Sequence, residues 1–266
     1  MNQNPDVAIA PGELPPIRKA PPAAVLRWVR LGWQDMRRSG WPSLLHGLIV
    51  TIASLVIVEI TLLFWPLLPG AVSGFLFVGP ILATGLYALC KQLESGERPR
   101  TKDAVDSWRR GCRCLYVLGL LLILAATLWV GITKLIFYFF VEAEINRPMD
   151  FLYYVVLQGN DTFMEWTILA GLVIALMYSL TVVSVQLLVD RDVTTKLALI
   201  TSLRAVSENP VTMFAWALFL LFATTLSIAT FMLGFLILYP LMGHASWHVY
   251  RELVDASDLP KRSGSE

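Results

Sequence analysis

Two long stretches without a charged side chain constrain what this chain can fold into. Residues 60–90 and residues 210–250 contain no Asp, Glu, Lys or Arg. Each stretch is longer than the roughly 20 apolar residues that a helix needs to cross about 30 Å of hydrocarbon. Hydrocarbon satisfies no backbone hydrogen bonds, so such segments must be helices. The sequence therefore predicts an all-α polytopic membrane protein and excludes a soluble globular enzyme.

Six transmembrane helices are predicted from the apolar runs and the residues that interrupt them. They lie at about 43–65, 70–92, 113–141, 165–189, 210–228 and 231–252. The first break is marked by Trp65-Pro66-Leu67-Leu68-Pro69-Gly70, because two prolines and a glycine do not continue a helix. The last break is placed near Ser227 to Thr230 on length alone, because one helix over 210–250 would be about 60 Å long.

The basic residues predict the orientation of these helices. All Lys and Arg except Lys134 and Arg147 fall in the N-terminal segment, two of the connections and the C-terminal end. By the positive-inside rule, both termini are expected in the cytoplasm. Residues 1–24, which are Pro-rich and polar, are predicted to be a disordered tail, residues 25–254 the membrane domain, and residues 255–266 a second cytoplasmic tail. A net charge of +1 offers no basic surface for nucleic acid.

An internal repeat is the main organisational signal. Gly74-Phe75-Leu76, followed by Pro80, recurs as Gly234-Phe235-Leu236, followed by Pro240. Segments at 25–38 and 101–112, ahead of predicted span pairs, read as amphipathic helices. The sequence thus predicts three tandem units, each an interfacial helix followed by a two-span hairpin.

The first amphipathic segment has the composition of a helix that lies on a membrane surface. Its predicted apolar arc consists of Leu26, Val29, Trp33 and Met36. The adjoining basic arc consists of Arg27, Arg30, Arg37 and Arg38. Apolar and basic arcs side by side are typical of helices that bind anionic lipid.

Pro80 and Pro240 lie inside predicted helices, where each is expected to produce a kink. Kinks at corresponding places in two repeats are one sign of a transport pathway. Prolines are also common in membrane helices, where neighbouring helices satisfy the freed carbonyl groups. Both readings stay open.

Two ionisable residues fall within predicted spans, Glu59 in the first and Lys134 in the third. Charged groups in hydrocarbon are costly and are usually paired or functional. We expect an intramembrane ion pair between them, with extension of Lys134 toward the membrane surface as the alternative.

The three histidines, His46, His244 and His248, all fall at predicted cytoplasmic helix ends. His244 and His248 are four residues apart and therefore share one helix face. Neutral imidazole is a good ligand for transition metals and haem iron, so the three are candidate ligands if the first and last spans touch. Alternatively they are interfacial polar residues, and no cofactor is bound.

Several motifs resemble a bacterial family of integral-membrane proteins, the domain of unknown function 2189. They are Gly79-Pro80, Gly85-Leu86-Tyr87 and Glu94-x-Gly96, then Asn209-Pro210, then Pro240-Leu241-x-Gly243-His244-Ala245-x-Trp247-His248-x-Tyr250-Arg251. The resemblance covers about 25–255. It implies a six-span protein of the bacterial inner membrane, and some members are described as similar to respiratory oxidase subunits. Three histidines are too few for the catalytic core of a haem–copper oxidase.

We therefore expect an inner-membrane protein without catalytic activity that acts as an accessory or assembly partner of another membrane complex. Transport of a small solute or ion is the alternative, and a haem- or metal-binding respiratory-type protein is the third hypothesis. The sequence determines neither the ligand, nor the partner, nor the oligomeric state.

Overall fold

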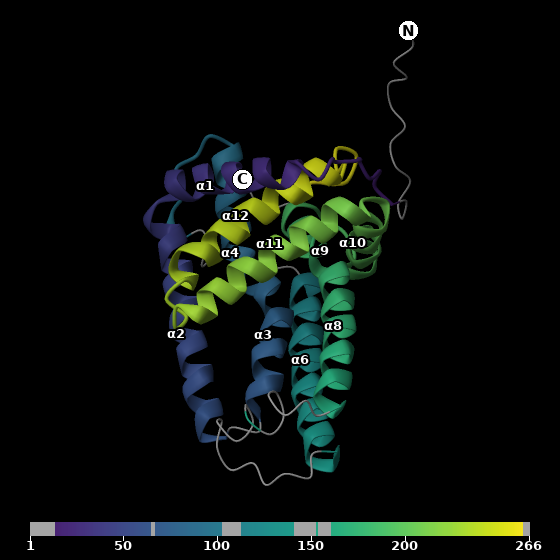
Figure 1. The fold of residues 1–266 in the computed structure, drawn as a ribbon. Coiled ribbons are helices and arrows are strands. Elements are labelled where there is room, and N and C mark those ends of the chain that lie inside the picture. Colours follow the sequence, from purple (N-terminus) through teal and green to yellow (C-terminus); the bar gives the residue numbers. More distant parts are fainter. Residues whose placement is uncertain (1–13, 65–66, 103–112, 141–152, 154–160, 263–266) are drawn as a thin grey trace.

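The computed structural model describes residues 14–64, 67–102, 113–140, 153 and 161–262, and the described residues are helical with two isolated β-bridges. Ten helices are defined among them (Figure 1). They are α1 (Ala24–Ser39), α2 (Trp41–Leu63), α3 (Leu68–Leu82), α4 (Thr84–Glu94), α6 (Arg113–Phe140), α8 (Asp161–Thr181), α9 (Ser184–Asp190), α10 (Thr195–Glu208), α11 (Pro210–Ala229) and α12 (Phe235–Leu253). The all-α prediction is confirmed.

The helices form two parts that differ in direction. In Figure 1, α2, α3, α6 and α8 run side by side along the long dimension of the molecule, whereas α11 and α12 run obliquely across its upper half. Helix α1 lies across the upper end, close to α12. Gly40 separates α1 from α2 with a φ of +59°, a conformation that favours glycine.

Most of the buried core lies in the upper part. Trp28, Trp216, Trp247 and Tyr250 are all fully buried there. Trp28 of α1 packs edge to face on Trp216 of α11, with ring centroids 5.9 Å apart. A smaller cluster of Phe77, Trp129 and Ala170 joins α3, α6 and α8. Helices α1, α4 and α9 all pack against α12 in one layer, from which the long helices extend.

Large apolar side chains cover the outside of the long helices. Examples on α6 are Leu120, Leu128 and Tyr138, each more than half exposed. A continuous exposed apolar surface of this kind is typical of a protein surface in contact with lipid or with another protein. Among the described residues, four segments are long and apolar enough to cross a membrane: Trp41–Ile60, Arg113–Phe140, Asp161–Asp190 and Pro210–Ala229.

Six spans are not confirmed. The predicted span at 70–92 is two helices in the structure, because α3 ends at Leu82 and α4 begins at Thr84. Pro80 has no N–H to continue the ladder, and the chain breaks two residues beyond it. Helix α12 continues through Pro240 but carries Arg251 and Glu252 in its last turn. The three tandem units likewise stay a prediction, and the segment at 101–112 lies largely outside the described residues.

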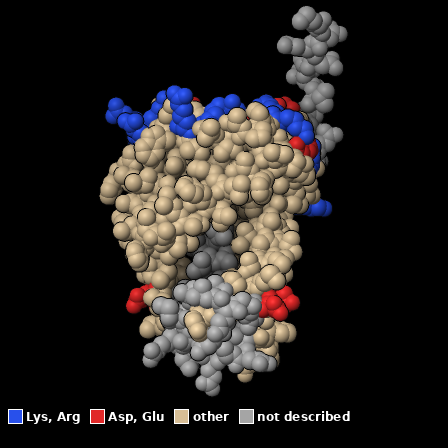
Figure 2. All heavy atoms as spheres, viewed as in Figure 1, with Lys and Arg blue, Asp and Glu red and all other residues tan. Residues whose placement is uncertain are grey.

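Charged residues gather at the end where α1 lies. Figure 2 shows Lys and Arg side chains concentrated there on the visible face, above a broad uncharged surface. We call the end formed by α1, α10 and residues 254–262 the basic end. Both ends of the described chain lie there.

The terminal segments are bound to the helices. Residues 14–23 belong to the predicted disordered tail, yet Arg18 donates its backbone N–H to the Leu253 carbonyl, and Asp255 donates to that of Pro16. The Arg18 guanidinium also pairs with Asp255 at 2.7 Å. Hydrogen bonds from Ser257 and Arg18 hold the pKa of Asp255 below its ordinary value. Hydrogen bonds and an ion pair therefore join the segment before α1 to the segment after α12 at the basic end.

Helix α1 forms as predicted, and one face of it packs against the protein. Trp28, Gly32 and Met36 are buried, whereas Leu26 is 77% exposed and Trp33 is 43% exposed. The exposure of Leu26 and Trp33 is compatible with an arc that faces a membrane surface, whereas Met36 of the same predicted arc is buried in the protein. Arg27, Arg30, Arg37 and Arg38 are all exposed, as a surface-binding basic arc requires.

Asp190 joins several segments at the basic end. Its carboxylate accepts hydrogen bonds from the Tyr250 hydroxyl at 2.8 Å and from Arg191 Nε at 3.0 Å. Lys91 and Arg251 lie 3.8 and 3.6 Å from it. One nearly buried carboxylate thus connects α4, α9 and α12.

We predict that Gly32→Ala destabilises the protein. A Cβ at Gly32 would lie 2.6 Å from the backbone nitrogen of Ala245, so α1 and α12 would have to separate. Overpacking of this kind costs about 1–3 kcal/mol. The matched control is Gly131→Ala on α6, where a Cβ meets nothing within 4 Å. Thermal unfolding in detergent should show a lower Tm for the first variant only, and equal Tm values would contradict the close approach.

We also predict that Asp190→Ala is strongly destabilising. Removing one partner of a buried ionic cluster leaves the others unpaired, which costs about 3–5 kcal/mol. Asp192→Ala is the control, because Asp192 is exposed and two residues away. Denaturant unfolding followed by tryptophan fluorescence measures both, and similar midpoints would mean that Asp190 does not join the helices energetically.

Candidate metal centre

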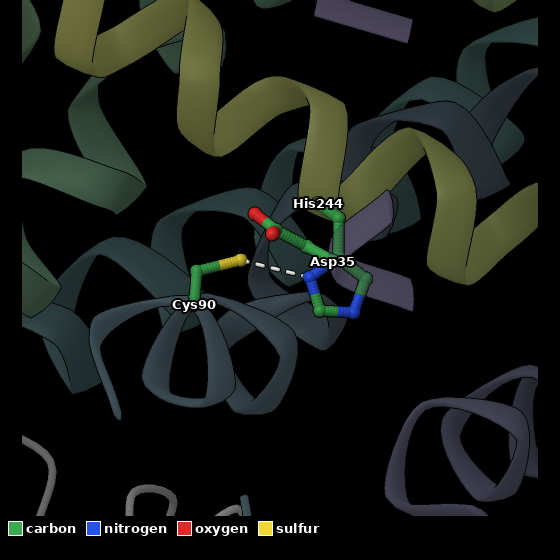
Figure 3. Close-up of side chains that lie close together, drawn as sticks. All are labelled: Asp35, Cys90 and His244. Carbon is green, nitrogen blue, oxygen red and sulfur yellow. Dashed lines mark hydrogen bonds between the residues drawn. The ribbon is translucent and has the colours of Figure 1, made fainter. Parts of the chain in front are cut away.

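Three potential metal ligands from three helices lie close together where α1 crosses α12. They are Asp35 of α1, Cys90 of α4 and His244 of α12, and their ligand atoms all lie within 4.8 Å of one another. Cys90 and His244 are buried, with exposed fractions of 1% and 0%. Figure 3 shows the Cys90 sulfur pointing at the His244 ring, with the Asp35 carboxylate beside them. The Cys90 Sγ lies 2.9 Å from His244 Nδ1.

Small residues on either side of His244 allow this meeting. Gly243 faces α4, where a Cβ would lie 2.4 Å from Leu86 Cδ1. Ala245 faces α1 at Gly32. Two neighbouring helices can therefore approach the α12 backbone on both sides of His244. The Tyr87 ring of α4 stacks on the Trp247 ring of α12, with ring centroids 6.3 Å apart. This contact fixes the position of α4 along α12.

Further residues orient two of the three ligands. Ser43 Oγ lies 2.7 Å from His244 Nε2, and His248 Nε2 lies 2.7 Å from Asp35 Oδ2. When Nε2 carries the His244 proton and donates it to Ser43, Nδ1 presents its lone pair to the cluster. Hydrogen bonds from outer residues to ligating side chains are a regular feature of metal sites in proteins.

The donor set points to a particular class of metal. A thiolate, an imidazole and a carboxylate are the ligands that Zn²⁺ takes in proteins, and three protein ligands with one open position are a common arrangement. Thiolate does not suit Mg²⁺ or Ca²⁺, which prefer oxygen ligands. The cluster therefore fits a zinc-class transition metal.

The structure places the predicted histidine ligands differently from one another. His244 is in the cluster, and His248 contacts it through Asp35. His46 Nδ1 lies 2.9 Å from the Pro42 carbonyl of its own helix, and its ring lies against Gly85. These positions do not test whether the three bind a metal together, so that ligand set stays a prediction.

Sequence reasoning missed Asp35 and gave Cys90 no role. Asp35 stands among Arg30, Arg37 and Arg38 and reads as part of a charged helix surface. The available signal was that it is the only acid between residues 15 and 58. What gives it a different role is the crossing of α1 over α12, which no local pattern encodes.

The predicted intramembrane ion pair is not formed in this structure. Glu59 on α2 and Lys134 on α6 are both exposed. Among the ion pairs between described residues, none joins them. The two helices stand on different sides of α3 in Figure 1.

Comparison with known proteins gives one match. Residues 67–190 match the family described as "Predicted integral membrane protein (DUF2189)". The resemblance to this family is confirmed. The matched stretch includes the motif at 79–96 and Cys90, and it ends before the motifs at 209–210 and 240–251. No curated protein matches the chain, and no solved structure does.

We predict that Cys90 resists modification while the protein is folded. Cys90 is buried and Cys114, at the start of α6, is partly exposed. Buried thiols are inert to aqueous reagents, so a water-soluble maleimide should label Cys114 about tenfold faster or more. Tryptic mapping places Cys90 and Cys114 in different peptides, because trypsin cleaves after Lys91 and after Arg113. Cleavage after Arg113 also separates Cys114 from Cys112. Equal rates would mean that the α4–α12 contact opens readily.

Proposed function

We propose that this protein is a multi-pass protein of the bacterial inner membrane that binds one zinc-class metal ion between α1, α4 and α12. The observation that carries the proposal is the convergence of Asp35, which is partly buried, with the buried Cys90 and His244. Basic residues gathered at one end support a cytoplasmic location for that end, and thus for both termini. The metal would then lie near the cytoplasmic surface.

Binding would fasten three helices to one another. The ligands come from separate parts of the chain, so an ion joins α1 and α4 to α12 as a cross-link does. Because the unfolded chain has no such preformed site, the free energy of binding adds to that of folding. A metal at this place would stabilise the layer of helices at the basic end.

The basic end also offers a surface for an accessory role. Arg30, Arg37 and Arg38 are exposed on α1, and Leu26 and Trp33 beside them are exposed apolar side chains. This combination suits the anionic lipid surface of the cytoplasmic leaflet. A larger membrane complex would bind to the same face of α1. The bound metal would fix the position of α1 relative to α4 and α12.

Transport receives less support from the geometry. The hypothesis rests on Pro80 and Pro240, and their neighbourhoods are bonded together. The Tyr239 hydroxyl donates to the Gly79 carbonyl at 2.8 Å. The two proline regions therefore brace each other, as prolines packed between membrane helices do.

The decisive experiment uses Co²⁺ as a spectroscopic probe of the detergent-purified protein. We expect about one Co²⁺ per chain, with a thiolate-to-metal charge-transfer band, displaced by Zn²⁺. Cys90→Ser should abolish the band, and His244→Ala and Asp35→Asn should abolish tight binding. His248→Ala should weaken binding by about 10–100-fold, as for other outer residues.

Cys114→Ser and His46→Ala are the controls. Both should bind Co²⁺ as the wild type does. Loss of binding in His46→Ala, with binding retained in Cys90→Ser, would favour the three-histidine set instead. A haem spectrum would favour the respiratory-type hypothesis, and a protein that binds neither metal nor haem would overturn the proposal.

A further inference from the structure

The turn between α11 and α12 is apolar and exposed. Phe231 is 83% exposed and Leu233 is 64% exposed. No charged residue occurs anywhere in the surrounding segment 210–250. A turn that projects into water usually consists of polar residues, Gly and Pro. The composition of this one is that of a surface in contact with hydrocarbon.

Every backbone N–H from residue 230 to residue 236 is satisfied within the hairpin. The N–H groups of residues 230–233 donate to the carbonyls of Leu226, Ile228, Ser227 and Thr230, in that order. The N–H of Gly234 donates to the Thr230 hydroxyl, and the N–H groups of residues 235 and 236 donate to the carbonyls of Met232 and Leu233. All seven donor–acceptor distances are 2.9–3.1 Å. A loop in water does not need this, because water satisfies its donors. Backbone inside hydrocarbon does need it, because each unsatisfied group costs several kcal/mol.

The turn also holds two residues in a rarely adopted conformation. Phe231 and Met232 have φ values of +51° and +67°. Non-glycine residues take such values only where the surroundings determine them. Gly234 closes the turn, since a Cβ there would lie 2.7 Å from Ser227 Cα. The turn is therefore held in this conformation by the packing and hydrogen bonds around it.

The depth of the turn can be read from α2. Leu236, at the start of α12, packs directly on Gly47 of α2. A Cβ added to Gly47 would lie 2.2 Å from the carbonyl oxygen of Leu236. Gly47 is only about 9 Å along α2 from Trp41, and α2 continues for about 24 Å beyond it. Figure 1 accordingly shows the turn beside the middle of α2, far from the lower ends of the long helices.

A pocket lies at the hairpin tip, between α11, α2 and α3. It is lined mainly by apolar side chains, including Ile57 and Val58 of α2 and Ile228 and Phe235 of the hairpin. With no charge in the lining and the turn at mid-depth, the ligand chemistry that matches is an acyl chain.

We infer that α11 and α12 form a re-entrant hairpin, which enters the membrane from the basic end and returns to it, with its tip covered by phospholipid acyl chains. The hairpin does not cross the bilayer, so it leaves both termini on the same side. The inference does not rest on the metal centre: His244 lies on α12, but the argument uses only the turn, its hydrogen bonds and its depth beside α2.

The test places a single reactive cysteine at the tip. Phe231→Cys is made with Cys112→Ser and Cys114→Ser, leaving only buried Cys90. Phe231 is highly exposed, so the substitution should not affect folding. An impermeant maleimide should label residue 231 from neither side of the membrane. A spin label there, in phosphatidylethanolamine–phosphatidylglycerol vesicles, should be more accessible to O₂ than to a water-soluble nickel chelate.

Two control variants in the same background define the two surfaces. Asp258→Cys, at an exposed position of the basic end, should be labelled from the cytoplasmic side, and Phe64→Cys, at the C-terminal end of α2, from the opposite side. Labelling of residue 231 from that opposite side would show that the hairpin spans the membrane and would overturn the inference. Greater accessibility to the nickel chelate than to O₂ would also overturn it.

Discussion

The close approach of α12 to its neighbours is the contact on which the rest of this structure depends. Small residues permit it at three levels: Gly32 against Ala245, Gly47 against Leu236, and Gly243 against Leu86. Between membrane helices there is little hydrophobic drive, so van der Waals contact between closely spaced backbones does much of the work. Through these contacts α12 positions α1, α2 and α4, and everything at the basic end is built on that frame.

The polar groups at the basic end are organised by the same frame. Burying a carboxylate, a thiol and an imidazole costs free energy unless each finds a partner. In this protein Asp35 has His248, His244 has Ser43, and Cys90 has His244. A bound cation would satisfy the three inner ligands together, which gives the cluster a physical reason to exist. Asp190 and its cationic partners form a second, separate network a short distance away on α4, α9 and α12.

Periodicity and charge predicted much of the fold. The helical class, an interruption between α2 and α3, a helix that begins at Pro210, and a helix over 25–38 follow from local rules. The count of six spans failed to gain support because hydropathy measures composition and not direction. An uncharged helix that lies obliquely, such as α11, has the same composition as one that crosses the bilayer.

The sequence by itself determined that this chain is a helical membrane protein with its positive charges at one end, because 30 Å of hydrocarbon excludes charge and demands internal hydrogen bonding over a fixed length. It also marked His244 as a residue of interest. Only the tertiary structure decided that Asp35 and Cys90 are its companions, that Glu59 and Lys134 stay apart, and where the α11–α12 turn lies. Those outcomes depend on which backbones approach within contact distance, and residues as far apart as 35, 90 and 244 share no local pattern that records it.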